Sequence, residues 1–187
     1  MTNHGSIMTK TAPTTRLVLA SSSPRRRELM LAGGLEFDVV PPPLPEPQTG
    51  RTCLPPAQQA EALAFFKARS VADRRSDAWV LGADTIVAAD GHLLGKPHDA
   101  DCARRMLRSL SGTRHAVITG VALLAGRQRR IIASDTTWIT MRQIAENEIE
   151  QYIASGEWQG KAGAYAIQET ADRYVLRVEG SFSNVVG

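Results

Sequence analysis

The chain has 187 residues, of which 43% are hydrophobic and 22% are charged. This is enough apolar material for one well-buried domain, and the composition is neither low in complexity nor typical of a membrane protein. The formal charge of +3 is too small to indicate a nucleic-acid-binding surface, although it suits an anionic substrate.

Two features bear on location and domain limits. Cys53 and Cys102 form no CxxC pair and give no disulfide framework, so we expect a reducing compartment and a cytoplasmic protein. Residues 1–14 are polar, and no later apolar run is long enough to cross a bilayer. We therefore expect a disordered tail at 1–14 and one domain at 15–187, with no membrane partner.

The first half of the chain alternates strand and helix patterns. Short apolar runs indicate strands, and prolines and glycines mark where helices begin and end. The expected elements are a strand at 16–20, a helix from Pro24 to Gly33-Gly34, a strand at 37–40, an extended proline-rich loop at 41–47, an amphipathic helix at 57–72 and a buried strand from Trp79 to Ala88.

The second half begins with a hairpin turn at Asp90-Gly91 and ends in a strand. Two long strand patterns in its middle predict an antiparallel hairpin, and hence a mixed sheet. The expected elements are a return strand through Leu93-Leu94, a helix from Asp99 to Gly112, strands at 115–124 and 130–141, a helix that stops at Gly156, a glycine-rich loop and a strand at 174–178.

The turn after the first strand combines small hydroxyls with guanidiniums. Ser21, Ser22 and Ser23 precede Pro24 and three arginines at 25–27. Arginines in the first turn of a helix oppose the helix dipole, so this turn favours a bound anion. Forked guanidiniums, hydroxyls and amide groups together match phosphate. The alternative, that the three arginines form a solvated helix start with no bound ligand, stays open.

Asp84 interrupts an apolar strand, where a carboxylate is costly to bury unless a metal, a cation or hydrogen-bond donors meet it. Asp84 and Glu46 form a possible Mg²⁺ site, because Mg²⁺ prefers oxygen ligands and shares itself with phosphates. Lys96 lies in a Gly-Lys-Pro turn and Lys67 on the helix at 57–72. A strand-end cap for Asp84 and a surface role for Lys96 are the plainer readings.

The loop at 160–168 leads into Gln168, whose amide is suited to read a nucleobase edge. The four histidines show no zinc-ligand spacing, and neither GxSxG, GxxxxGK[ST] nor GxGxxG occurs. The phosphate site is therefore of another design.

Taken together and in this order, four motifs resemble the Maf family of nucleoside triphosphate pyrophosphatases. The motifs are LASSSPRR at 19–26, GADTIV at 82–87, GKP at 95–97 and KAGAYAIQ at 161–168. The resemblance implies an α/β fold of the inosine-triphosphatase type, with a mixed twisted sheet flanked by helices and a central cleft. It also implies a possible homodimer that cleaves nucleotides between the α and β phosphates with Mg²⁺, Mn²⁺ or Co²⁺.

The resemblance assigns roles to single residues. Arg25 and Arg26 are expected to grip phosphates, Lys67 and Lys96 to line the phosphate channel, and Thr85 and Gln168 to face the base. Asp84 and Glu46 are expected to bind metal or activate water. The catalytic set is thus Asp84, Glu46 and Lys96, and the substrate-binding set is Ser21, Ser23, Arg25, Arg26, Lys67, Thr85, Lys161 and Gln168.

The Asp-Thr pair at 84–85 is similar to the branch that prefers dTTP and UTP. Glu169 departs from the family, which usually has glycine there, and the chain ends at Gly187 where relatives commonly continue. Two other functions stay open. One is a nucleotide monophosphatase or kinase, which detection of orthophosphate instead of pyrophosphate would favour. The other is a nucleic-acid or regulatory binding module, which the scattered basic residues disfavour.

Overall fold

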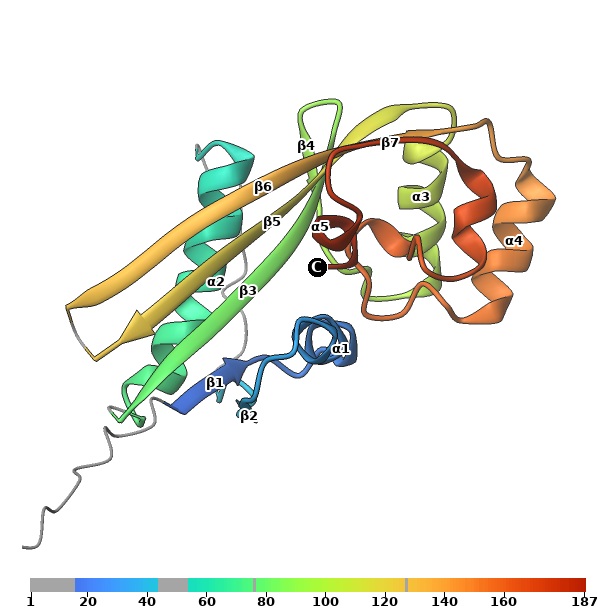
Figure 1. The fold of residues 1–187 in the computed structure, drawn as a ribbon. Coiled ribbons are helices and arrows are strands. Elements are labelled where there is room, and N and C mark those ends of the chain that lie inside the picture. The colour runs from blue at the N-terminus through green and yellow to red at the C-terminus, as the bar shows by residue number, and fades with distance from the viewer. Residues whose placement is uncertain (1–15, 44–53, 76, 127) are drawn as a thin grey trace, which may run out of the picture.

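The computed structural model describes residues 16–43, 54–75, 77–126 and 128–187 (Figure 1). The expected tail at 1–14 and the expected metal ligand Glu46 lie outside the described residues. Long, curved strands form the centre of the molecule, with a long helix across them and a group of helices at their far end (Figure 1).

The strands form one mixed sheet in the order β2-β1-β3-β5-β6-β7, with β4 paired to β3. The β1 strand runs parallel to β2 and β3, and the pairs from β3 to β7 are antiparallel. This confirms the predicted mixed sheet. The strands are β1 Arg16–Ala20, β2 Asp38–Val39, β3 Ala78–Ala89, β4 His92–Leu94, β5 Arg114–Ala125, β6 Arg129–Met141 and β7 Val175–Glu179.

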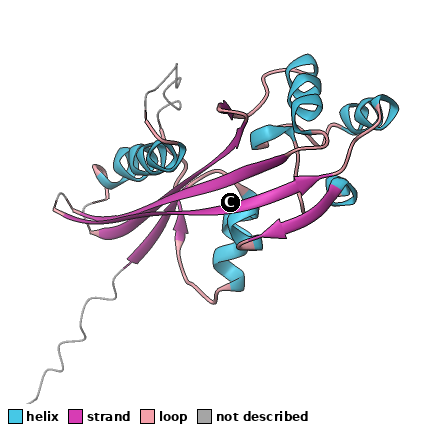
Figure 2. Ribbon diagram, turned by 90° about the horizontal axis from the view of Figure 1, so that it is seen from above, coloured by secondary structure: helices cyan, strands magenta, loops and turns pink. Residues whose placement is uncertain are grey.

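Helices flank this sheet, as Figure 2 shows in a view from above. They are α1 Pro24–Ala32, α2 Pro56–Ala72, α3 Ala100–Leu110, α4 Glu146–Ser155 and α5 Phe182–Val186, with 3-10 turns η1 at Ala162–Ala164 and η2 at Thr170–Tyr174. Among the described residues, no helix combines the length and apolar character needed to cross a bilayer.

Local signals account for most element ends. The Asp99 side chain accepts a 2.6 Å hydrogen bond from Cys102 N and begins α3, and Gly156 ends α4 with a φ of 76°. The predicted strand at 37–40 shortens to two residues before Pro41. The α5 helix was not predicted, because its five residues span too few turns to show a periodic pattern.

Two glycines let α2 lie unusually close to the sheet. A Cβ atom added at Gly82 would lie 2.4 Å from Ala64 O, and one at Gly120 would lie 2.3 Å from the carbonyl carbon of Ala60. Both contacts are with the backbone of α2, which cannot yield locally. Since Gly120 pairs with Asp84 across β5 and β3, this close approach brings α2 directly over Asp84.

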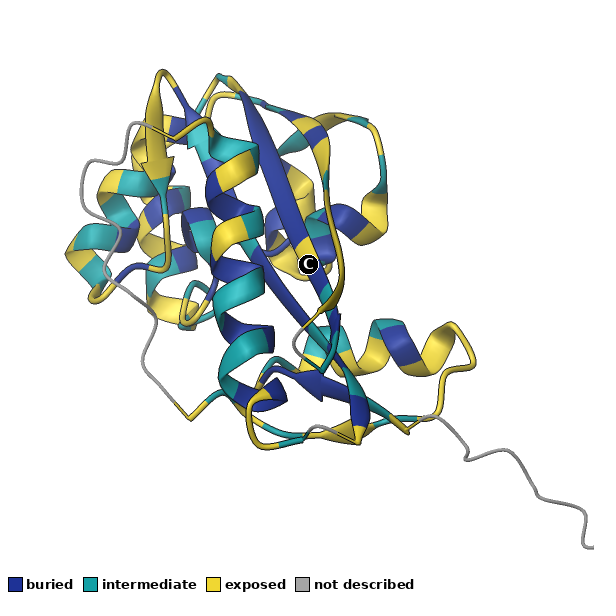
Figure 3. Cartoon of the chain, turned by 90° about the vertical axis from the view of Figure 1, so that its left-hand side faces the viewer, coloured by how far each residue is buried: buried dark blue, intermediate teal, exposed yellow. Residues whose placement is uncertain are grey.

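The buried residues form a core on either side of this contact (Figure 3). One part lies between α2 and β1, β3 and β5, and includes Val18, Ala68, Val80 and Leu124. The larger part packs α3 and α4 with the 3-10 turns against the ends of the strands, around side chains such as Leu107, Ile139, Ile149, Tyr152 and Tyr174.

Candidate active site

The β3 strand has a gap in its pairing that exposes the predicted site. On one edge, β1 pairs with β3 up to Gly82, and β4 begins to pair at Val87. Residues 83–86 of β3 therefore pair with neither β1 nor β4 along this edge. Asp84 and Thr85 lie in this gap, at the end of β1 where the chain turns into α1. Ends of strands beside such interruptions are common ligand sites in α/β proteins.

A cavity of about 540 Å³ opens at this gap. That volume lies in the range of small-molecule sites. Segments from across the chain line it, and they include all ten of the predicted site residues that the structure describes: Ser21, Ser23, Arg25, Arg26, Lys67, Asp84, Thr85, Lys96, Lys161 and Gln168. Among the described residues that line the cavity, five have basic side chains and one has an acidic side chain, so the cavity suits a polyanion.

The start of α1 forms one wall. Pro24 occupies the first helical position, and no acidic residue lies in the first turn. Ser21 is buried and its hydroxyl accepts a hydrogen bond from Ser23 N at 3.1 Å. Arg26 donates to Ser21 Oγ at 3.4 Å and to Thr85 Oγ1 at 3.2 Å. The guanidinium is thus fixed at the positive end of the helix, where anions bind.

Lys67 and Asp84 form an ion pair at the bottom of the cavity. The Lys67 ammonium donates to Asp84 Oδ1, and each side chain is only 7% exposed. The predicted need of Asp84 for a cation is met here by a residue of α2, which Gly82 and Gly120 allow to approach. Such a buried pair is costly to form and costlier to break by removal of one partner.

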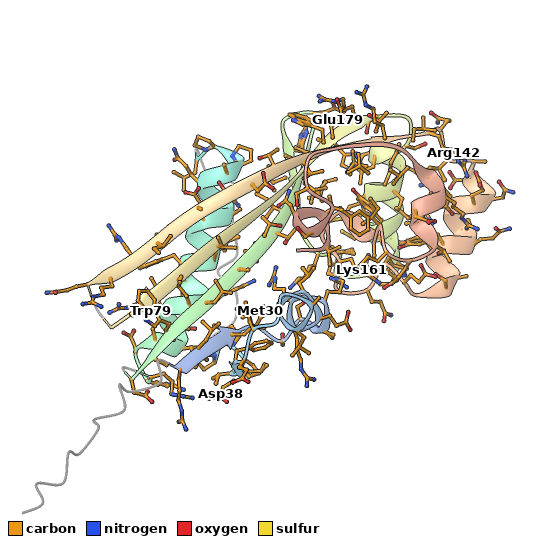
Figure 4. All side chains as sticks on the ribbon, in the orientation of Figure 1. Met30, Asp38, Trp79, Arg142, Lys161 and Glu179 are labelled. Carbon is orange, nitrogen blue, oxygen red and sulfur yellow. The ribbon has the colours of Figure 1, made fainter. Side chains whose placement is uncertain are left out.

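The opposite wall is the loop that contains η1. Gly163 N donates to Gly95 O at 3.0 Å, which ties this loop to the turn of Lys96. The buried Lys161 ammonium donates to Glu157 O and, at 2.7 Å, to Glu169 Oε2. In Figure 4 Lys161 lies on the side where α1 approaches the C-terminal helices. Glu169, the departure from the family pattern, is therefore half of an ion pair.

A buried histidine supports the same loop, and sequence reasoning missed it. His115 is fully buried, and its Nε2 lies 2.8 Å from Tyr165 Oη, with the two rings edge to face. Burial lowers the pKa of His115 to about 4 and raises the pKa of the Tyr165 hydroxyl. His115 is therefore neutral near pH 7. Its place in an apolar strand was the only sequence signal.

Asp84 is suited to share a divalent cation with a phosphate ligand. Its carboxylate lines the cavity beside basic groups that suit phosphate oxygens, and Mg²⁺ typically takes one or two carboxylates plus phosphates. Among the described residues there is no cluster of three His, Cys, Asp or Glu side chains that would hold a metal alone. The donor set thus fits a metal bound together with substrate.

The fold and the cavity define an α/β protein whose cavity, at an interrupted edge of the sheet, suits a phosphate-rich ligand. Residues 16–187 match the family described as Maf-like protein. The chain belongs to this family.

Curated relatives are similar over nearly the whole chain. A dTTP/UTP pyrophosphatase of Pelotomaculum thermopropionicum is 45% identical over 91% of this chain and 89% of its own length. One of Thermomicrobium roseum is 50% identical over 91% of this chain and 78% of its own length. A solved nucleoside-triphosphatase, described as a dITP/XTP pyrophosphatase, of Mycobacterium abscessus aligns with a TM-score of 0.46 and 17% identity over 70% of this chain and 76% of that one.

Proposed function

We propose that this protein hydrolyses nucleoside triphosphates between the α and β phosphates, yielding a nucleoside monophosphate and pyrophosphate. The single observation that carries the proposal is the shared cavity of Arg26 and Asp84, lined by further basic side chains. The names of the relatives support dTTP and UTP as the substrates.

The residues of the cavity suit attack by water on the α-phosphorus. Charge then develops on the bridging and non-bridging oxygens, and fixed cations such as Arg25, Arg26 and Lys96 stabilise it. Asp84 is the carboxylate that orients the water and accepts its proton. Lys67 holds Asp84 in place by the buried ion pair.

We assign the divalent cation to Asp84 and the substrate phosphates, with Glu46 as a predicted further ligand that lies outside the described residues. When bound, such a cation supplies positive charge to the phosphate oxygens. The cations to be tested are Mg²⁺, Mn²⁺ and Co²⁺.

A screen of nucleoside triphosphates tests the proposal. The protein is incubated with dTTP, UTP, CTP and GTP in the presence of each cation, and pyrophosphate and orthophosphate are measured separately. Release of pyrophosphate, fastest with dTTP or UTP, is the expected result. Orthophosphate as the first product would instead indicate a phosphatase or kinase, and no turnover at all would overturn the enzyme assignment.

Substitution of Asp84 tests its role. Asp84→Asn should lower kcat by about a hundredfold or more, the scale for losing acid-base help. The substitution also leaves the buried Lys67 ammonium without its carboxylate partner, so urea unfolding is measured alongside and kcat is compared under conditions where both proteins are folded. Asp90→Asn is the matched control, because Asp90 lies exposed at the β3–β4 turn with a φ of 47° that asparagine also tolerates. Turnover of Asp84→Asn close to that of the wild type would remove Asp84 from the mechanism.

Two predictions concern the setting of this activity. A cytoplasmic location follows from the expected reducing compartment, and a homodimer follows from the resemblance to the family. Fractionation and the sedimentation behaviour of the full chain would test them.

A further inference from the structure

Thr85, which the resemblance places near the base, forms hydrogen bonds with two protein side chains, Arg26 and Thr119. Its Oγ1 lies 3.2 Å from Arg26 Nη2 and 2.9 Å from Thr119 Oγ1. A guanidinium has donors only, so Thr85 accepts the bond from Arg26. In the bond between Thr85 and Thr119 either hydroxyl could donate, and the other partners of Thr119 decide which one does.

The partners of Thr119 settle that direction. Its Oγ1 donates to the main-chain carbonyl of Asn184 at 2.8 Å. A carbonyl oxygen only accepts, and a hydroxyl has one proton, so the proton of Thr119 is used in this bond. Thr85 must therefore donate to Thr119. The order of donors runs from Arg26 to Thr85, then to Thr119, and ends at Asn184.

The Asn184 end of this chain is firmly held. Asn184 is 7% exposed. Its Oδ1 accepts from Thr119 N at 3.1 Å, and its Nδ2 donates to Val117 O at 3.0 Å and to Thr137 Oγ1 at 2.9 Å. Because every polar group of this side chain is bonded to β5 or β6, the C-terminal segment fixes the position of Thr119 relative to the sheet.

This order leaves Thr85 no proton for the substrate. Thymine and uracil present carbonyl oxygens on either side of a ring N–H, and reading those oxygens requires a donor. The hydroxyl of Thr85 already donates to Thr119 and accepts from Arg26. What Thr85 does offer is a fixed acceptor that directs one arm of the Arg26 fork, while Ser21 accepts from the other arm.

We infer that Thr85 is a positioning residue that aims the Arg26 guanidinium at the substrate phosphates, and that Thr119 and Asn184 hold it in place. This inference rests on the proposed function for the identity of the substrate. It assigns to Thr85 an effect on phosphate binding and excludes the Thr85 hydroxyl as a donor to the base carbonyls.

A probe without a base separates the two roles. Binding of inorganic tripolyphosphate, with and without Mg²⁺, is measured by calorimetry for the wild type, Thr85→Val and Thr85→Ser. Thr85→Val removes the acceptor of the Arg26 guanidinium and the donor to Thr119, and it should weaken tripolyphosphate binding about three- to tenfold. Thr85→Ser keeps the hydroxyl and should bind within about twofold of the wild type. Unchanged binding in Thr85→Val would overturn the inference.

Thr119→Val provides a second, independent variant, because Thr119 lies outside the described lining of the cavity. It removes the acceptor of the Thr85 proton, so it should weaken tripolyphosphate binding in the same direction, about threefold. Thermal unfolding of each variant shows whether it is folded. If Thr119→Val binds tripolyphosphate as the wild type does, the hydroxyl chain does not position Arg26.

Turnover adds a readout of base choice. In Thr85→Val the values of kcat/KM for dTTP, UTP, CTP and GTP should fall by one common factor, so that their ratios stay as in the wild type. A changed ratio with unchanged tripolyphosphate binding would make Thr85 a reader of the base. If the wild type hydrolyses no triphosphate, the proposed function fails, and the calorimetry still decides the role of Thr85.

Discussion

Replacing His115 with glutamine should make the protein less sensitive to acid. Burial lowers the pKa of His115 from 6.5 to about 4. The unfolded chain therefore binds a proton at this residue between those two pH values while the folded protein does not. Folding stability from this group is complete above about pH 6.5 and is lost as the pH falls toward 4.

The size of the effect follows from the two pKa values. At about pH 5 the unfolded histidine is almost fully protonated and the folded one almost neutral, which costs the folded state about 2 kcal/mol relative to about pH 7.5. The Arg142-bonded carboxylate of Glu148 contributes little in this window. Glu148 has a pKa lowered from 4.5 to about 2 by its bond to Arg142, so its contribution is lost only below about pH 4.5.

Urea unfolding at about pH 7.5 and about pH 5 measures this difference. Glutamine does not titrate and retains a group that can bond the Tyr165 hydroxyl, so His115→Gln should lose about 2 kcal/mol less than the wild type between the two conditions. His98→Gln is the control, because the His98 side chain is 74% exposed, and it should keep the wild-type dependence. Equal losses in the wild type and His115→Gln would refute the burial argument.

Two further substitutions test the architecture of the cavity. Gly120→Ala should destabilise the fold by about 3 kcal/mol in urea unfolding and lower turnover as well, because the added methyl group meets the backbone of α2. Gly95→Ala, whose Cβ would meet no atom within 4 Å, should change stability little, and equal losses in both variants would contradict the close-packing account. Arg26→Lys should raise the KM for triphosphates about tenfold, since an ammonium lacks the fork. Arg27→Lys, on the exposed side of α1, should leave KM unchanged. An equal rise in KM in both variants would show that the effect is not specific to the guanidinium of Arg26.

The element types and the chemistry of the cavity were accessible from the sequence. Capping at Asp99, the turn at Asp90-Gly91 and the long strand-like runs of β5 and β6 are local signals, so the predicted elements were confirmed within a few residues. The resemblance to the Maf family carried the expectation that Arg26 and Asp84 share a site, and both residues line one cavity. That reasoning needed only residue types and their order.

The partners of these residues depended on the tertiary structure. Lys67 pairs with Asp84 because Gly82 and Gly120 let α2 lie against the sheet, and no local pattern encodes that distance. The proton order through Thr85 likewise requires β5 and the C-terminal segment to meet at Thr119. Sequence by itself determined which groups the site contains. Long-range packing decided which of them are bonded to each other, since hydrogen bonds and ion pairs form only at contact distances.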